Sequence, residues 1–422
     1  CDCINKYGDW RVTNKRAGGA NNFTVNEKDI GAYFQVDFDI ELFNRPFRGN
    51  FGERLVQTTV DATGNSTAGR PLTGGNRYTD FLPSINLSYE PVDNLITRFA
   101  LSQVMARPLL GNLSPAITNI TIPTTGVFTG ATMTVGNPKL QPFRATNFDA
   151  SIEWYFAPGG LISLAYFNKD IKSFPQTIAY EGPLSNFLDA AAIAALRLQF
   201  TDPAQLAYID SDAPFQARQF RDAPGGYIRG IEASIQMDFT FLPGFLKNFG
   251  AQVNFTKISS QLNYILDPGS ASTPQTIGQA PFLGVSPQAF NATLYYESKK
   301  FRARVSAAQR KGFASTYPLA SGACAPGIIA PAPTSPATIG ANNAPGGLCT
   351  GPLVNDFQYS RSTLNVDASA SWQFFDFATL TLEALNLTNQ KTERYAYQGQ
   401  EAVTNYASTG RILRVGLRMK FK

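Results

Sequence analysis

Carboxylates and guanidinium groups recur at alternate positions of ten-residue runs, and they are the most chemically capable side chains in this sequence. A hydrolase would need two carboxylates at one defined separation, but alternating runs supply such pairs by chance. We therefore interpret these side chains as ion pairs that line a lumen and either hold neighbouring strands together or seat a plug. The acids are Glu90, Asp149, Glu153, Glu232, Asp238, Glu297, Asp367 and Glu383, and the basic residues are Arg98, Arg302, Arg304, Arg414 and Arg418.

Other catalytic and binding chemistry is restricted by composition. The chain has no histidine, which excludes Ser-His-Asp triads, histidine-bearing zinc sites and histidine pH switches. No spaced calcium-loop pattern appears, so we expect neither a metal nor a cofactor. The net charge of +5 is spread along the chain, which argues against nucleic-acid binding. We therefore do not expect an enzyme.

Six aromatic residues lie in two long stretches near the C-terminal end. They could stack on a sugar or an aromatic ligand, or they could pack against one another within loops. The sequence leaves both interpretations open. The six are Phe313, Tyr317, Tyr359, Tyr395, Tyr397 and Tyr406.

The four cysteines divide into two groups. Cys324 and Cys349 bracket a stretch rich in Pro, Ala and Gly, and a bond between them would stabilise the loop by about 3 kcal/mol. Such a bond fits an oxidising compartment or the cell surface. Cys1 and Cys3 are too close in sequence to pair comfortably with each other, so their pairing stays open.

The elements that carry these residues show two-residue alternation of apolar and polar side chains. The last run is clear: Leu413, Val415 and Leu417 alternate with Arg414 and Arg418. This period is that of a β-strand with two different faces. Thirteen such runs begin near residues 28, 48, 80, 94, 146, 161, 229, 249, 288, 301, 362, 378 and 411.

The connections between the runs alternate between short and long. Bacterial outer-membrane barrels have short periplasmic turns and longer extracellular loops, whereas a soluble sandwich has no reason to keep this rule. The chain is therefore predicted to be an all-β, antiparallel transmembrane β-barrel. The short connections fall at 39–47, 91–93, 157–160, 240–248, 298–300 and 375–377, and the long ones at 60–79, 105–145, 169–228, 259–287, 311–361 and 389–410.

In this barrel the apolar face meets lipid and the polar face lines a lumen. Glu53 breaks the rule, because it falls on the lipid side between Phe51 and Leu55. A bulge, a neutral carboxyl or a protein neighbour could relieve the cost. Within one long connection, residues 184–200 predict a short surface helix with Ser185 or Asp189 as N-cap.

Thirteen is an odd number of strands, so the first and last strands run in the same direction and an antiparallel sheet cannot close. Open edges are not tolerated in hydrocarbon. We therefore expect further strands from a missing N-terminal portion or from a partner. A barrel of about 22 strands with a plugged lumen is the natural size.

Several segments carry a family resemblance: Gly136-Asn-Pro-Lys-Leu-Gln-Pro with the strand after it, Arg229-Gly-Ile-Glu-Ala, Leu385-Asn-Leu-Thr-Asn and the closing strand. They resemble the barrels of TonB-dependent outer-membrane receptors. The initial Cys-Asp-Cys and Ala157-Pro-Gly-Gly are similar to the branch found in Caulobacter, Xanthomonas and sphingomonads. The resemblance implies that residues 1–422 form the C-terminal part of the barrel, with the plug domain, the TonB box and the first strands absent.

The resemblance also implies a function in the bacterial outer membrane: TonB-energised import of a scarce nutrient. The partners would be membrane lipid, the plug and remaining strands, the TonB complex and a small-molecule nutrient. The branch favours a carbohydrate or other organic compound slightly over an iron chelate. The alternative is a passive pore or a structural attachment barrel completed by another polypeptide. Phe421 would serve as the C-terminal aromatic read during barrel assembly.

Overall fold

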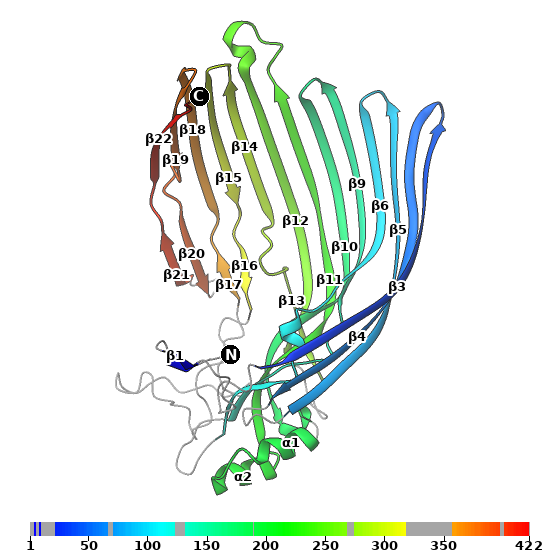
Figure 1. The fold of residues 1–422 in the computed structure, drawn as a ribbon. Helices are drawn as coiled ribbons and strands as arrows, with labels where there is room; N and C mark the ends of the chain where they lie inside the picture. The colour runs from blue at the N-terminus through cyan, green and yellow to red at the C-terminus, as the bar shows by residue number, and fades with distance from the viewer. Residues whose placement is uncertain are drawn as a thin grey trace.

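A computed structural model describes residues 4–5, 8–9, 22–65, 71–122, 131–188, 190–267, 274–317, 357–396 and 401–421. The fold is an antiparallel sheet in which thirteen strands follow one another side by side. Their order along the sheet is their order in the sequence (Figure 1). The strands are β3 (Thr24–Leu42), β4 (Arg45–Asn65), β5 (Pro71–Val92), β6 (Leu95–Ala106), β9 (Phe143–Ala157), β10 (Gly160–Pro183), β11 (Pro214–Asp238), β12 (Phe249–Asp267), β14 (Gln288–Glu297), β15 (Phe301–Arg310), β18 (Thr363–Phe375), β19 (Ala378–Leu385) and β22 (Ile412–Met419).

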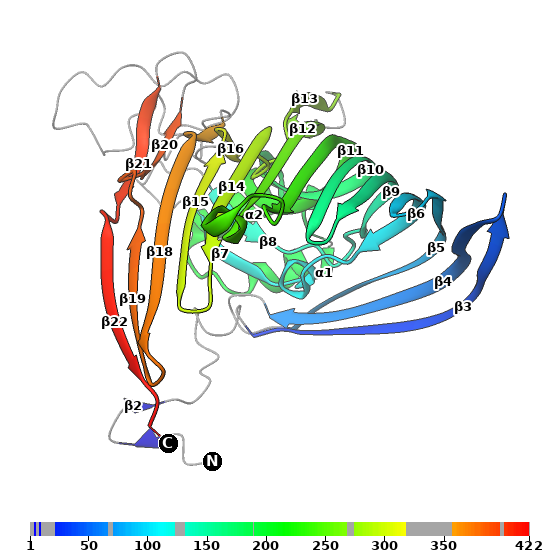
Figure 2. The same ribbon diagram turned by 90° about the horizontal axis from the view of Figure 1, so that it is seen from above.

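These thirteen strands confirm the thirteen alternating runs and the antiparallel all-β prediction. The six short connections gather at one end of the sheet, at the top of Figure 1, and one of them contains the 3-10 helix η3 (Gly244–Asn248). The α-helices α1 (Ala190–Arg197) and α2 (Pro203–Asp210) lie at the opposite end. The sheet curves strongly, with β3 and β22 at the two ends of the curve (Figure 2). None of the helices that the structure describes is both long and apolar enough to span a bilayer.

The two faces of the sheet differ in chemistry. On β22, the apolar side chains Leu413 and Val415 are each 75% exposed, although they are large and aliphatic. Leu413 faces Ala384 and Val415 faces Leu382 in the pairing of β22 with β19, whereas Arg414 faces Glu383. Because paired residues share a face, one face of the wall is apolar and the other is charged. The apolar face is the one suited to lipid.

Strands extend far into two stretches predicted as long connections, 60–79 and 169–228, and those boundaries were wrong. β4 and β5 stay paired until Asn65 faces Pro71, and β10 and β11 until Pro183 faces Pro214. The wrong boundaries arise because the apolar side chains change from one face of the strand to the other. Phe51 and Leu55 are apolar and point outward, whereas from Val56 onward the apolar side chains point inward and are buried. The apolar side therefore changes from the outside to the inside above the membrane.

Several short strands and helices lie at the end of the sheet where the long connections are. A separate four-stranded sheet contains β16, β17, β20 and β21, and β7, β8 and β13 join the main sheet at its margin. The separate sheet, β7, β8, β13 and α2 all lie in stretches that were predicted from the sequence as long connections. The bounds are β1 (Ile4–Asn5), β2 (Gly8–Asp9), β7 (Ile117–Thr121), β8 (Ala131–Val135), β13 (Thr276–Ala280), β16 (Phe313–Thr316), β17 (Gln358–Ser360), β20 (Lys391–Ala396), β21 (Ala402–Ser408), η1 (Leu110–Leu113), η2 (Leu184–Asn186), η3 (Gly244–Asn248), α1 (Ala190–Arg197) and α2 (Pro203–Asp210).

The predicted surface helix exists as α1, but it is shorter than expected. Ser185 is not its N-cap, because it lies in η2 and its hydroxyl donates to Asp212 Oδ2 at 2.6 Å. Asp189, the other candidate, lies outside the described residues. α2 has Asp202 as N-cap, which accepts a hydrogen bond from the Ala204 amide at 2.8 Å.

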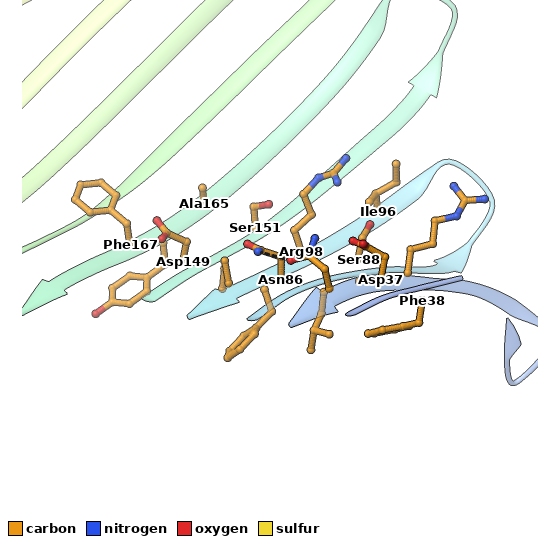
Figure 3. Close-up of a pocket in the computed structure, with 18 of the residues that line it drawn as sticks. Asp37, Phe38, Asn86, Ser88, Ile96, Arg98, Asp149, Ser151, Ala165 and Phe167 are labelled. Atoms are coloured by element: carbon orange, nitrogen blue, oxygen red, sulfur yellow. Dashed lines mark hydrogen bonds between the residues drawn. The ribbon is translucent and has the colours of Figure 1, made fainter. Parts of the chain in front are cut away.

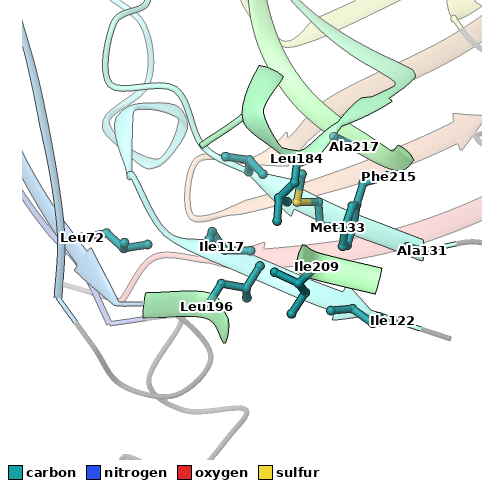
Figure 4. Close-up of a cluster of buried hydrophobic side chains, with 11 residues drawn as sticks. Leu72, Ile117, Ile122, Ala131, Met133, Leu184, Leu196, Ile209, Phe215 and Ala217 are labelled. Carbon is teal, nitrogen blue, oxygen red and sulfur yellow. The ribbon is translucent and has the colours of Figure 1, made fainter. Parts of the chain in front are cut away.

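A hydrophobic core lies at this end, beyond the membrane wall. Leu184, Leu196 and Phe215 are fully buried together with residues of β7 and β8 (Figure 4). β8 pairs in parallel with the extended part of β11, from Ala131 opposite Phe215 to Val135 opposite Gln219. The loops therefore form a compact extracellular layer with its own core.

Glu53 lies where the sequence placed it, on the apolar face. It pairs with Phe34 on β3 and with Pro83 on β5. The register of both neighbouring ladders is continuous through this point, so a bulge does not relieve its cost. Of the three explanations that the sequence allowed, a neutral carboxyl and a protein neighbour remain.

Candidate functional site

The concave face of the wall carries a hollow of about 790 Å³ formed by β3 to β11. Arg98, Ser151, Asp149 and Phe167 project into it from the same side of the sheet (Figure 3). Alternation puts these side chains on the face opposite the apolar one. The small side chain of Ala165 sits between the longer ones and leaves the space.

Ion pairs bind neighbouring strands across this lumen face. Arg48 Nε lies 3.1 Å from Asp39 Oδ2, and Arg98 Nε lies 3.1 Å from Glu153 Oε1. Further along the wall the predicted residues also pair: Arg302 with Glu297 at 3.0 Å, and Arg414 with Glu383 at 3.7 Å. The interpretation of these acids as partners in ion pairs is confirmed for those three predicted pairs. Apart from Glu153, whose side chain is 22% exposed, the paired groups are exposed, so each pair contributes little to stability by itself.

The floor of the hollow depends on one glycine. A Cβ at Gly230 would lie 2.8 Å from Phe167 Cζ and 2.5 Å from the Lys257 carbonyl oxygen. Phe167 faces Gly230 in the pairing of β10 with β11, and its ring edge lies over the glycine. The aromatic surface is thereby presented beside Asp149, which it also faces across the ladder with β9.

Above the hollow, the segment after β6 folds back across the interior. Arg107 reaches the first strands of the wall: its Nη2 lies 2.8 Å from Asp29 Oδ1, and its Nε lies 3.4 Å from Glu27 Oε1. The Thr58 hydroxyl donates to the same Asp29 oxygen at 2.7 Å. This network is half-buried, so it resists screening better than the lumen pairs do.

The run from Gly136 to Pro142 anchors the same segment to both sides of the interior. Asn76 donates to the carbonyl oxygens of Lys139 and Leu140 at 3.0 Å, and Asn137 donates to the Phe220 carbonyl at 2.9 Å. A Cβ on Gly136 would lie 1.6 Å from the Ser114 carbonyl oxygen, so only glycine fits. This run, which carried part of the family resemblance, therefore ties β5 to β11 beneath the extracellular layer.

The structure brings three of the predicted loop aromatics into one chain of rings. Tyr317 and Tyr359 both contact Phe357, with ring centroids 4.6 and 6.3 Å apart, and Tyr359 stacks on Tyr395 at 5.5 Å. Tyr264 of β12 joins the chain at 5.9 Å from Tyr317. The rings therefore pack against one another, while Tyr359 and Tyr395 stay partly exposed.

The remaining predicted site residues are dispersed. The Phe313 ring lies 4.0 Å from the Arg310 guanidinium carbon, and the Tyr406 ring lies 5.4 Å from Lys391 Nζ, away from the chain of rings. Phe421 lies just beyond β22 and is 81% exposed. Tyr397, Cys324 and Cys349 lie outside the described residues, so the disulfide stays a prediction.

Burial sets the electrostatics of the ring chain. Desolvation raises the pKa of Tyr264 to about 12, partly opposed by the hydrogen bond from the Leu283 amide. Desolvation also raises the pKa of Tyr317 to about 12. Both phenols are therefore neutral at physiological pH and act as hydrogen-bonding and apolar groups. Among the described residues, no three or more of His, Cys, Asp and Glu gather as a metal site would require.

Arg107, Tyr264 and Phe357 were not predicted from the sequence as functional residues. Arg107 lies in the predicted long connection 105–145, and the acids it binds lie about 80 positions earlier in the chain. Tyr264 sits on a strand extension that had been interpreted as loop. A signal existed for Phe357, which lies two residues before Tyr359 on the approach to a strand.

Comparison with known proteins agrees with this geometry. Residues 4–387 match the family model described as "TonB dependent receptor-like, beta-barrel". The chain therefore belongs to the family of TonB-dependent receptor β-barrels, which places it in the outer membrane of Gram-negative bacteria, with long extracellular loops and short periplasmic turns. No curated protein sequence matches the chain.

Solved structures share the fold at low identity. The siderophore receptor PiuA from Acinetobacter baumannii is 13% identical with a TM-score of 0.54, over 94% of this chain and 44% of that one. The FrpB iron transporter from Neisseria meningitidis is 14% identical with a TM-score of 0.51, over 95% of this chain and 47% of that one. The chain thus spans about half the length of these structures.

Proposed function

We propose that this chain forms part of the wall of a TonB-energised importer that takes up a scarce nutrient across the outer membrane. The observation that carries the proposal is the polar, ion-paired concave face under an extracellular layer that is anchored into the interior by Arg107 and by residues 136–142. A face of this kind suits a ligand that is captured outside and passed inward. Family membership supports the same conclusion.

Two substrate classes fit the proposal. The resemblance to the Caulobacter, Xanthomonas and sphingomonad branch favours a carbohydrate or another organic compound. The structural neighbours are a siderophore receptor and an iron transporter, which favours an iron chelate. In either case we propose that Phe313, Tyr317, Tyr359, Tyr395, Tyr397 and Tyr406 contribute ring surface to ligand binding, and that the plug and the TonB complex act with the wall.

The two ends of the sheet bear on how the wall is completed. β3 and β22 run in the same direction, and the described residues contain no pairing between them. We propose that additional strands close the barrel, because an unpaired strand edge is costly in lipid. The intact mass of the polypeptide extracted from outer membranes tests this: a mass well above 45.9 kDa supports completion by the same chain, and a mass near it supports completion by a partner.

Uptake by whole cells tests the function. Cells with and without the gene would be given labelled oligosaccharides, aromatic compounds and ferric chelates, each with and without an uncoupler of the proton gradient. The proposal predicts gene-dependent uptake of one class that the uncoupler abolishes. Gene-dependent uptake that continues with the uncoupler would instead identify a passive pore, the alternative function.

A further inference from the structure

Three basic residues form a row on the outward, lipid-side face of the wall. Arg229 lies two residues before Ile231 on β11, so the two side chains share a face. Ile231 faces Tyr166 on β10, and Ile231 and Tyr166 are each 41% exposed, as expected on the outward face. Lys257 faces Ile231 on the next strand. Lys311 follows the end of β15, and its amide donates to the carbonyl of Gln288, which faces Lys257.

The three basic residues have polar neighbours but no carboxylate partner among the described residues. Arg229 faces Asn168 on one side and Ser259 on the other, and its guanidinium carbon lies 4.6 Å from the centre of the Tyr227 ring. In the described part of the chain, Arg229, Lys257 and Lys311 make no ion pair with a carboxylate. All three are exposed.

The acid on the adjoining row does not neutralise this charge. Asp170 faces Tyr227, and it is already engaged in an ion pair with Lys172 of its own strand. Within the described ranges, three cations on one face thus have no counter-ion.

The depth of the row in the membrane follows from the register. Toward the short turns, the next outward residues are Phe255 on β12 and Phe290 on β14, which face each other. Toward the long loops, the next outward residues are polar, beginning with Ser259. The row therefore marks the border of the apolar band on the extracellular side, where the headgroups of the outer leaflet lie.

We propose that Arg229, Lys257 and Lys311 form a binding site for the phosphate groups of lipids in the outer leaflet. Exposed cations at this depth attract anionic headgroups, with about 1 kcal/mol contributed by each Lys or Arg. The row crosses β11, β12, β14 and β15. At about 4.8 Å between neighbouring strands it extends over roughly 14 Å. That length suits a headgroup with two separated phosphates better than a single free phosphate ion.

The site is tested with the intact protein in detergent and three probes: lipid A with two phosphates, the same lipid without phosphates, and inorganic phosphate. Native mass spectrometry would measure lipid occupancy. The test variant combines Arg229→Gln, Lys257→Gln and Lys311→Gln. The control variant combines Lys247→Gln, Lys299→Gln and Lys300→Gln, which removes three cations at the short-turn end.

The expected result is that the wild-type protein binds the phosphorylated lipid in preference to the lipid without phosphates. The test variant should bind the phosphorylated lipid on the order of a hundredfold more weakly, because about fivefold is lost with each cation. The control variant should bind as the wild type does. Equal binding of both lipids, equal loss in both variants, or displacement of the lipid by inorganic phosphate at similar concentration would overturn the proposal. Each variant would first be shown to resist unfolding in detergent as the wild type does.

Discussion

Gln176 and Ile265 exchange two hydrogen bonds across 89 positions of sequence: Gln176 Nε2 donates to the Ile265 carbonyl at 3.0 Å, and the Ile265 amide donates to Gln176 Oε1 at 2.8 Å. The Gln176 side chain, on β10, therefore satisfies both backbone polar groups of Ile265 on β12, as a neighbouring strand would. It is buried, with 7% of its surface exposed. This contact joins two of the long strands above the membrane and beside the chain of aromatic rings.

Replacing Gln176→Leu should loosen this extracellular junction. Two backbone groups of Ile265 would lose their partner while buried, at a cost of about 2 to 4 kcal/mol. Hydrogen exchange of the Ile265 amide should quicken by about two orders of magnitude or more. Gln279→Leu is the control, since Gln279 is an exposed amide on β13, and should leave that exchange unchanged. Unchanged exchange in Gln176→Leu would contradict the assigned contact.

The Arg107 network should matter more than the lumen ion pairs. Arg107→Gln leaves Glu27 and Asp29 without their cation in a half-buried site, so we expect a loss of about 1 to 3 kcal/mol. Arg48→Gln removes an ion pair whose side chains are 66% and 68% exposed, so a loss below about 1 kcal/mol is expected. Urea denaturation in detergent gives both values. Equal losses would mean that Arg107 does not hold the segment in place.

Alkaline pH should weaken the packing of the ring chain. Burial raises the pKa of Tyr264 and of Tyr317 to about 12, from the ordinary value of 10.0. Because the folded state holds these protons more tightly, the stabilisation is complete below pH 10 and is lost as pH rises toward about 12. Absorbance at alkaline pH should show one late-titrating phenol fewer in Tyr264→Phe than in the wild type. An unchanged titration curve would show that Tyr264 is not desolvated.

The contact between α1 and α2 should respond to acid. Arg197 holds the pKa of Asp210 below its usual value through a hydrogen bond of 2.6 Å. A depressed pKa means that the stabilisation is present above the unfolded-state value and is lost as pH falls through the folded-state value. Both groups are exposed, so the effect should be small. Amide exchange in α2 should rise at acidic pH in the wild type and lose that dependence in Asp210→Asn; identical pH dependence in both would refute the pairing.

The membrane-spanning part of the fold was predictable because lipid outside and a polar lumen inside impose one strict alternation. Above the membrane this rule ends. After Leu55 the apolar residues change to the inward phase at Val56, so the outward apolar alternation stops although β4 continues to Asn65. If the apolar side chains are expected on one face throughout a strand, the residues beyond the change are interpreted as loops. For this reason the extracellular parts of the strands were not predicted.

The candidate site was less predictable for a different reason. Arg107 and Asp29 meet only because β6 ends and its following segment folds back over β3 and β4. Such contacts depend on tertiary placement and leave no periodic trace in the sequence. The aromatic residues were found by type, but whether Tyr359 and Tyr395 would meet depended on the separate extracellular sheet.

The central claim is that one face of this sheet meets lipid and the other lines a lumen, and spin-label accessibility along β22 tests it most directly. Labels would be placed at Leu413→Cys, Arg414→Cys, Val415→Cys and Gly416→Cys, one at a time, in a background with the four native cysteines replaced by serine. The account predicts that labels at 413 and 415 collide mainly with dissolved oxygen, and that labels at 414 and 416 collide mainly with a water-soluble nickel complex. Similar accessibility at all four positions would contradict it.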